Sequence, residues 1–136
     1  MALLFAACSK DDSTAGDKIP RSQLDARVNG TMFYPTETQA YLSGDVLTII
    51  GVRNLGTGRE SAISLQLKHY NGPKSYGVDT ATQASYTDLG VVYTADSGAV
   101  VITEISSTKY AGSFAFRAVG QAGTVRVTSG VIDIYK

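Results

Sequence analysis

Few residues of this chain combine a side chain suited to nucleophilic or acid–base catalysis with a matching spacing. Cys8 is the only cysteine and His69 the only histidine among the 136 residues. They lie far apart, one in a polar N-terminal stretch and one at the end of an expected strand, so a Cys–His pair is not expected. Ser106 and Lys109 have an S-x-x-K spacing, but that motif needs a helix starting at the serine. A hairpin turn is expected there instead, and we predict neither catalytic residues nor enzymatic activity.

Metal and phosphate sites are not predicted either. One cysteine excludes a thiolate site with two sulfurs and an intramolecular disulfide. Asp79, Asp88 and Asp96 lie in expected loops, but their spacing matches no calcium-binding loop. The stretch GTGRE at 56–60 lacks the third glycine and the following helix of a phosphate-binding loop. We therefore expect no metal and no cofactor.

Tyrosine is the residue type that leaves a ligand site open. Four of the eight tyrosines fall in the least regular part of the sequence. Aromatic rings exposed on loops of a β domain can form a contact patch for a sugar or a protein. The alternative is that they are ordinary core and rim residues of a sheet. The residues of this possible ligand patch are Tyr70, Tyr76, Tyr86 and Tyr93.

The elements that must position these side chains are short strands. From residue 23 onward, apolar and polar residues alternate in short runs between Gly, Asn, Asp and Ser. Ser61–His69 has the clearest alternation, Asn29-Gly30 is typical of a two-residue hairpin turn, and Val91–Thr94 and Ala99–Ile105 are expected as separate strands. We predict an all-β fold, an antiparallel β-sandwich or small β-barrel of about nine to eleven short strands.

The charge pattern gives no sign of nucleic-acid binding. Lys and Arg number 12, as do Asp and Glu, and charged residues make up 18% of the chain. No run of five or more like charges occurs. We therefore expect no nucleic-acid partner.

The N-terminal residues differ from the rest of the chain in their pattern. Ala2–Ala7 is apolar but far shorter than the ~20 residues that span a bilayer. Leu4–Cys8 resembles the lipobox of bacterial lipoproteins, with Phe5 in place of the usual Leu. The resemblance implies that Cys8 is lipidated on its sulfur. We expect residues 1–7 to be a truncated signal-peptide remnant without its basic region, residues 8–22 to be the lipidated cysteine and a flexible tether, and residues 23–136 to form the β domain.

Two further resemblances concern export and modification. The residues after the cysteine are similar to the surface-export signal of Bacteroidota lipoproteins: Ser9, Lys10, Asp11 and Asp12. Asp12-Ser13-Thr14 and Asp79-Thr80-Ala81 resemble the O-glycosylation acceptor of the same phylum. These resemblances imply export to the cell surface and possible O-glycosylation of Ser13 and Thr80.

The domain itself resembles a family of small Bacteroidota outer-membrane lipoproteins of uncharacterised function. Members begin with a V-N-G-x-x-F strand pair and close with G-x-F-x-F-x-A and x-T-x-G-x-F-x-I strands. The matching residues are Val28, Asn29, Gly30 and Phe33, then Gly112, Phe114, Phe116 and Ala118, then Thr128, Gly130 and Ile134. Ile132 stands where the family has Phe. These residues belong to strands and turns, so the resemblance implies fold and location and carries no active site.

Together these observations favour a non-catalytic, surface-exposed outer-membrane lipoprotein that acts as an interaction or accessory module of an envelope complex. The expected partners are the membrane, through the lipid on Cys8, and a protein of the outer membrane or cell surface. The alternative is a glycan- or small-ligand-binding accessory lipoprotein of a nutrient uptake system.

Overall fold

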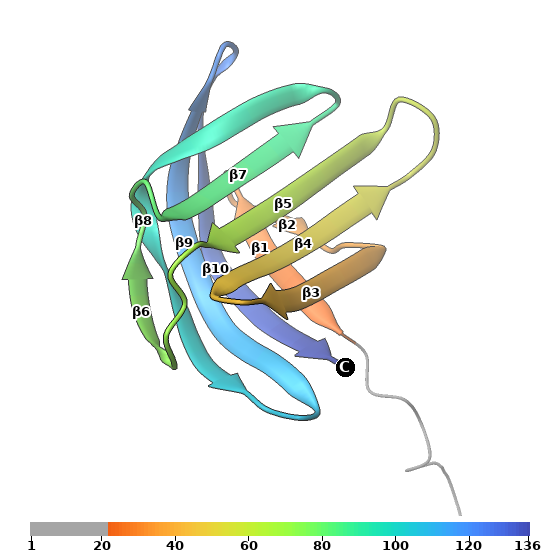
Figure 1. Ribbon diagram of the computed structural model, residues 1–136. Helices are drawn as coiled ribbons and strands as arrows, with labels where there is room; N and C mark the ends of the chain where they lie inside the picture. The colour runs from red at the N-terminus through yellow and green to blue at the C-terminus, as the bar shows by residue number, and fades with distance from the viewer. Residues whose placement is uncertain (1–21) are drawn as a thin grey trace, which may run out of the picture.

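The predicted all-β fold is confirmed in the computed structural model, which describes residues 22–136 and contains no helix in that part of the chain. Ten strands form, within the expected range of nine to eleven (Figure 1). They are β1 Gln23–Val28, β2 Thr31–Phe33, β3 Glu37–Ser43, β4 Val46–Asn54, β5 Glu60–Leu67, β6 Lys74–Gly77, β7 Thr82–Asp88, β8 Val91–Ile105, β9 Lys109–Gly120 and β10 Gly123–Tyr135.

All ten strands belong to one antiparallel sheet, in the order β2-β1-β10-β9-β8-β7-β5-β4-β3, with β6 paired beside β8. Apart from β6, the strands from β3 to β10 are therefore neighbours in chain order, and β1 pairs with β10 on its other side. Because strands twist, a sheet this wide curls, and here it forms a half-barrel (Figure 1). Of the expected alternatives, the barrel-like form describes the molecule better than two separate sheets.

Strand β8 differs from the expected pattern. Val91–Thr94 and Ala99–Ile105 form one continuous strand instead of two, because the residues between them make a bulge in place of a turn. The register with β9 shifts between Ala95 and Ser97, and Gly98 has φ 125°. The first part of β8 pairs with β7 and the second part with β6. The bulge therefore marks the point where the sheet changes neighbours.

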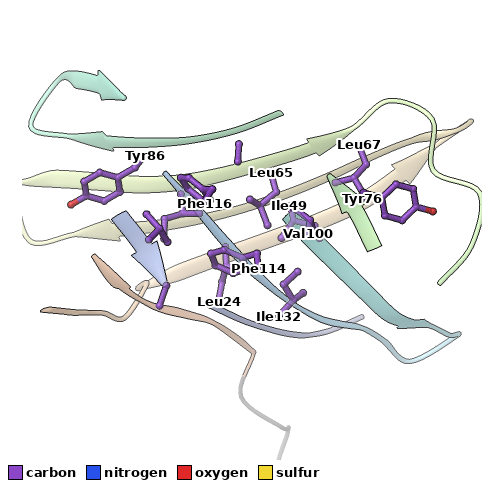
Figure 2. Packing of buried hydrophobic residues seen from close by; sticks show 14 of the residues in the cluster. Leu24, Ile49, Leu65, Leu67, Tyr76, Tyr86, Val100, Phe114, Phe116 and Ile132 are labelled. Atoms are coloured by element: carbon purple, nitrogen blue, oxygen red, sulfur yellow. The ribbon is translucent and has the colours of Figure 1, made fainter. Parts of the chain in front are cut away.

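The core fills the concave side of the curled sheet (Figure 2). Along β5 every second residue is buried, as its sequence alternation predicts. Leu24 of β1 is fully buried and lies so close to β4 that a Cβ atom on Gly51 would be 2.7 Å from its Cδ2. The two ends of the sheet therefore pack against each other through the core, which closes the curl without hydrogen-bonding β3 to β2.

Candidate functional site

An open cleft, which we call the rim cleft, lies at one end of the sheet. It has a volume of about 710 Å³, within the ~300–1,000 Å³ typical of small-ligand sites. The β4–β5 loop and the β7–β8 turn form it, because β5 pairs directly with β7. Its lining residues are Asn54, Gly56, Thr57, Gly58, Glu60, Ser61, Ala62, Thr87, Leu89 and Gly90.

The β4–β5 loop is held in shape by its own polar groups. The Asn54 side-chain oxygen accepts a hydrogen bond from the Gly56 N–H at 3.0 Å, and its amide donates to a Glu60 carboxylate oxygen at 3.4 Å. The Arg59 N–H donates to the Gly56 carbonyl at 3.0 Å, and the Leu55 N–H donates to the Arg59 carbonyl at 3.2 Å. The loop therefore closes on itself, and Leu55 is left with 45% of its surface exposed.

The β7–β8 turn presents an unusual leucine. Leu89 and Gly90 form a two-residue turn with φ 51° and 88°, values typical of a type I′ hairpin. Asn, Asp and Gly are favoured at the first of these positions, and the left-handed conformation of a leucine there costs roughly 1–2 kcal/mol. The Leu89 side chain is 61% exposed, so little burial offsets this cost, while its N–H donates to the Glu60 carbonyl at 2.9 Å. The turn is thus fixed to β5 and displays an apolar side chain beside the cleft.

Replacing this leucine by a residue suited to the turn is expected to stabilise the fold. Leu89→Asn should raise the free energy of unfolding by about 1 kcal/mol, because asparagine tolerates the left-handed conformation. Thermal or urea unfolding measures the change. Leu55→Asn is the matched control, since Leu55 is also exposed but has no positive φ, and its effect should stay within about 0.5 kcal/mol. A loss of stability in Leu89→Asn would contradict the assignment of strain.

One hydroxyl of the cleft faces the core. Ser61 is buried on the concave side of the sheet, as is Tyr86 of the neighbouring strand β7. Burial, followed by the charge of the Asp88 carboxylate, raises the pKa of Tyr86. A tyrosine already carries its proton at neutral pH, and the raised pKa keeps the Tyr86 phenol a hydrogen-bond donor.

The cleft as a whole offers polar contacts and an apolar margin. Its side chains supply one carboxylate, one amide and three hydroxyls, with Ala62 and Leu89 as the apolar members. Groups of this kind orient and hold a ligand by hydrogen bonds while apolar contacts contribute affinity. The arrangement is suited to recognition.

The four tyrosines of the expected ligand patch form two pairs instead of one cluster. Tyr70 and Tyr76 have ring centroids 5.7 Å apart, and Tyr86 and Tyr93 have centroids 6.1 Å apart. Tyr76 and Tyr86 belong to the buried core, where they lie at opposite ends (Figure 2). The Tyr76 hydroxyl donates to the Gly72 carbonyl and accepts from an N–H of the same connection, so its visible role is to fix that turn.

The other residues singled out by the sequence serve turns or lie at the surface. Asp79 accepts hydrogen bonds from the N–H groups of Ala81 and Thr82, both at 2.8 Å, and Thr80 is exposed within this turn. The Ser106 hydroxyl accepts from the N–H groups of two residues in the β8–β9 turn. His69 lies 3.4 Å from a carboxylate oxygen of Asp45, in an exposed pair.

Several predictions fall on residues that the structure does not describe. Cys8, the export residues Ser9, Lys10, Asp11 and Asp12, and Ser13 are all outside residues 22–136. Within residues 22–136, no cluster of three or more His, Cys, Asp or Glu side chains could hold a metal ion. That same part of the chain has no helix long and apolar enough to cross a membrane.

Comparison with protein-family models, with curated proteins and with solved structures finds no match to this chain. Function must therefore be inferred from the chemistry of the surfaces themselves. The sequence did hold a signal for the rim cleft: a leucine before a glycine in a two-residue turn, where Asn or Asp is usual. It gave no sign that Asn54 and Leu89 lie at the same cleft.

Proposed function

We propose that this chain is a non-catalytic binding module, anchored in the outer membrane through a lipid on Cys8, whose rim cleft binds a protein of the cell envelope. The observation that carries the proposal is the exposed, strained Leu89 at the edge of the rim cleft. Strain that brings no gain in burial is typical of positions selected for function. The lipid anchor and the location follow from the sequence resemblances and are part of the proposal.

The positions of the two ends of the β domain support this arrangement. Gln23 pairs with Asp133, and the Tyr135 N–H donates to the Ser22 hydroxyl at 3.0 Å, so the domain begins and ends at the same end of the sheet. The ladders from β10 to β5 place the rim cleft at the other end (Figure 1). A domain held at residue 22 by a membrane anchor would present the cleft away from the membrane.

The apolar margin of the cleft favours a protein as the partner. Leu89 lines the cleft, Leu55 belongs to the β4–β5 loop that forms it without lining it, and both side chains are exposed. Burying one leucine side chain contributes about 1.5–3 kcal/mol. Two leucines beside a polar cleft resemble the apolar anchors and polar surroundings found at the centre of protein interfaces.

Removing both leucines is expected to weaken the association strongly. We expect the full-length lipoprotein, purified from solubilised outer membranes, to carry a protein partner in fixed stoichiometry. In the Leu55→Asn/Leu89→Asn double variant the affinity should fall roughly a hundredfold or more, from the lost burial of two leucines. Because Leu89→Asn stabilises the turn, the loss would not reflect unfolding, which thermal unfolding can verify.

The matched control is Ser107→Asn, in the β8–β9 turn at the opposite end of the sheet. This variant should retain the partner in full. Equal retention by the double variant, or the absence of any stoichiometric partner in the native protein, would overturn the proposal.

A further inference from the structure

The convex face of β3, β4, β5, β7 and the first part of β8 contains no charged side chain over most of its area. The strand segments 38–43, 46–52, 61–67, 82–87 and 91–95 have no Asp, Glu, Lys or Arg at all. Charged residues normally cover much of an exposed protein surface. We call this surface the neutral face.

Polar side chains lie in register on the neutral face. Thr48 is opposite Gln66, which is opposite Gln83, in one row across three strands. Ser64, Ser85 and Thr94 form the next row. Neighbouring strands are ~4.8 Å apart, so the two rows make a regular array of hydroxyl and amide groups. They line a shallow hollow of about 340 Å³.

Thr48 is the most sheltered group in this array. Only 7% of its surface is exposed, although it lies on the convex side of the sheet. No hydrogen bond within residues 22–136 involves its hydroxyl group, nor the side chains of Gln66 and Gln83 beside it. Since sheltered polar groups are nearly always hydrogen-bonded, the Thr48 hydroxyl lacks a partner that a ligand in the hollow could supply. Gln66 is half-buried and Gln83 is exposed, so their amides can be reached from solvent.

The chemistry of the face selects a neutral polyhydroxyl ligand. Without charges it has no counterpart for phosphates, acidic peptides or basic peptides. Hydroxyl and amide groups both donate and accept hydrogen bonds, as sugar hydroxyls do. Tyr41, 45% exposed, lies directly opposite Thr48 on the edge strand β3 and can cover the apolar face of a sugar ring.

We propose that the neutral face binds a neutral glycan, with Thr48, Gln66 and Gln83 hydrogen-bonding to sugar hydroxyls and Tyr41 packing against a ring. This site is separate from the proposed protein contact at the apolar margin of the rim cleft. It places glycan recognition on the convex surface of the sheet, away from the four tyrosines singled out in the sequence.

Titration of the purified full-length protein with soluble neutral polysaccharides tests this assignment. Dextran, mannan, xylan and a β-glucan are the probes, and polygalacturonate is the charged comparison. We expect saturable binding of at least one neutral polymer by calorimetry, and weaker or no binding of polygalacturonate. Gln66→Ala/Gln83→Ala and, separately, Tyr41→Ala should each lower the affinity at least tenfold.

The matched control is Gln121→Ala, an exposed glutamine in the β9–β10 turn, which should bind as the native protein does. Thermal unfolding establishes that each variant is folded, and Tyr41→Ala on the edge strand provides a second test if the double variant is unstable. Absence of binding to every neutral polymer, or binding that the variants leave unchanged, would overturn the assignment. So would a concentration-dependent dimer, seen by light scattering, that the neutral-face variants dissolve, because a second copy would then be the occupant. The partner test at the rim cleft uses different residues, so the two proposals can fail separately.

Discussion

Replacing Gly98 with alanine is expected to lower the free energy of unfolding by about 3 kcal/mol or more. Gly98 has φ 125°, a conformation that is costly for any residue with a Cβ atom. A Cβ at this position would also lie 2.3 Å from the Ala115 carbonyl oxygen and 2.5 Å from the Phe116 Cα. Both are backbone atoms of the adjacent strand β9, so neither can rotate out of the way.

The effect should be large because Gly98 lies where β8 changes its neighbour from β7 to β6. Its carbonyl accepts a hydrogen bond from the Val78 N–H at 2.9 Å, just after β6. Moving the backbone to relieve the contact would disturb β6, β8 and β9 together. The melting temperature should fall by roughly 10 °C or more, as measured by circular dichroism or calorimetry.

Gly77 provides the control for this substitution. It lies in β6 opposite Ala99, next to Gly98 in space, but it has no positive φ and a Cβ there would meet nothing within 4 Å. Gly77→Ala should therefore change stability by no more than about 0.5 kcal/mol. If the two variants were equally stable, the bulge would not be the constraint that the structure indicates.

Replacing Cys8 with alanine is expected to move the protein from the membrane fraction to the soluble fraction of the cell envelope. The proposed lipid is attached to the Cys8 sulfur, and burying acyl chains contributes about 0.8 kcal/mol per CH₂. Fractionation and mass spectrometry of the amino terminus measure the outcome, and Ser13→Ala is the control that should keep the lipid.

A Cys8→Ala protein that stays in the membrane fraction would contradict the anchor. An intact Met1 at the amino terminus of the native membrane-bound protein would contradict it as well. Neither result would bear on the fold, because the anchor proposal and the description of the β domain rest on different residues.

Strands with simple alternation could be predicted from the sequence. Ile63 and Leu65 of β5 face the core as their period of two requires, and Asn29 and Gly30 form the expected tight turn with φ 50° and 85°. The incorrect prediction of two separate strands in place of β8 has a local cause. Asp96-Ser97-Gly98 is typical of a turn, but a glycine with positive φ can equally form a bulge that keeps the strand continuous.

The candidate sites depend on which strands are neighbours, and that could not be predicted. The rim cleft exists because β5 pairs with β7, while β6 leaves the sequential path and pairs with β8. The absence of charge in five segments could be read from the sequence, but their assembly into one face could not. Tyr76 illustrates the same limit, since its short strand gives no periodicity to show that its ring turns inward.

Photo-crosslinking in intact cells tests most directly whether the rim cleft is the protein-binding surface. A photoreactive amino acid at position 89 lies beside the cleft, and the same amino acid at position 107 lies at the opposite end of the sheet. We expect a discrete protein adduct from position 89 and none from position 107. Adducts of equal yield from both positions, or an adduct from position 107 alone, would contradict a binding module that presents its rim cleft to an envelope partner.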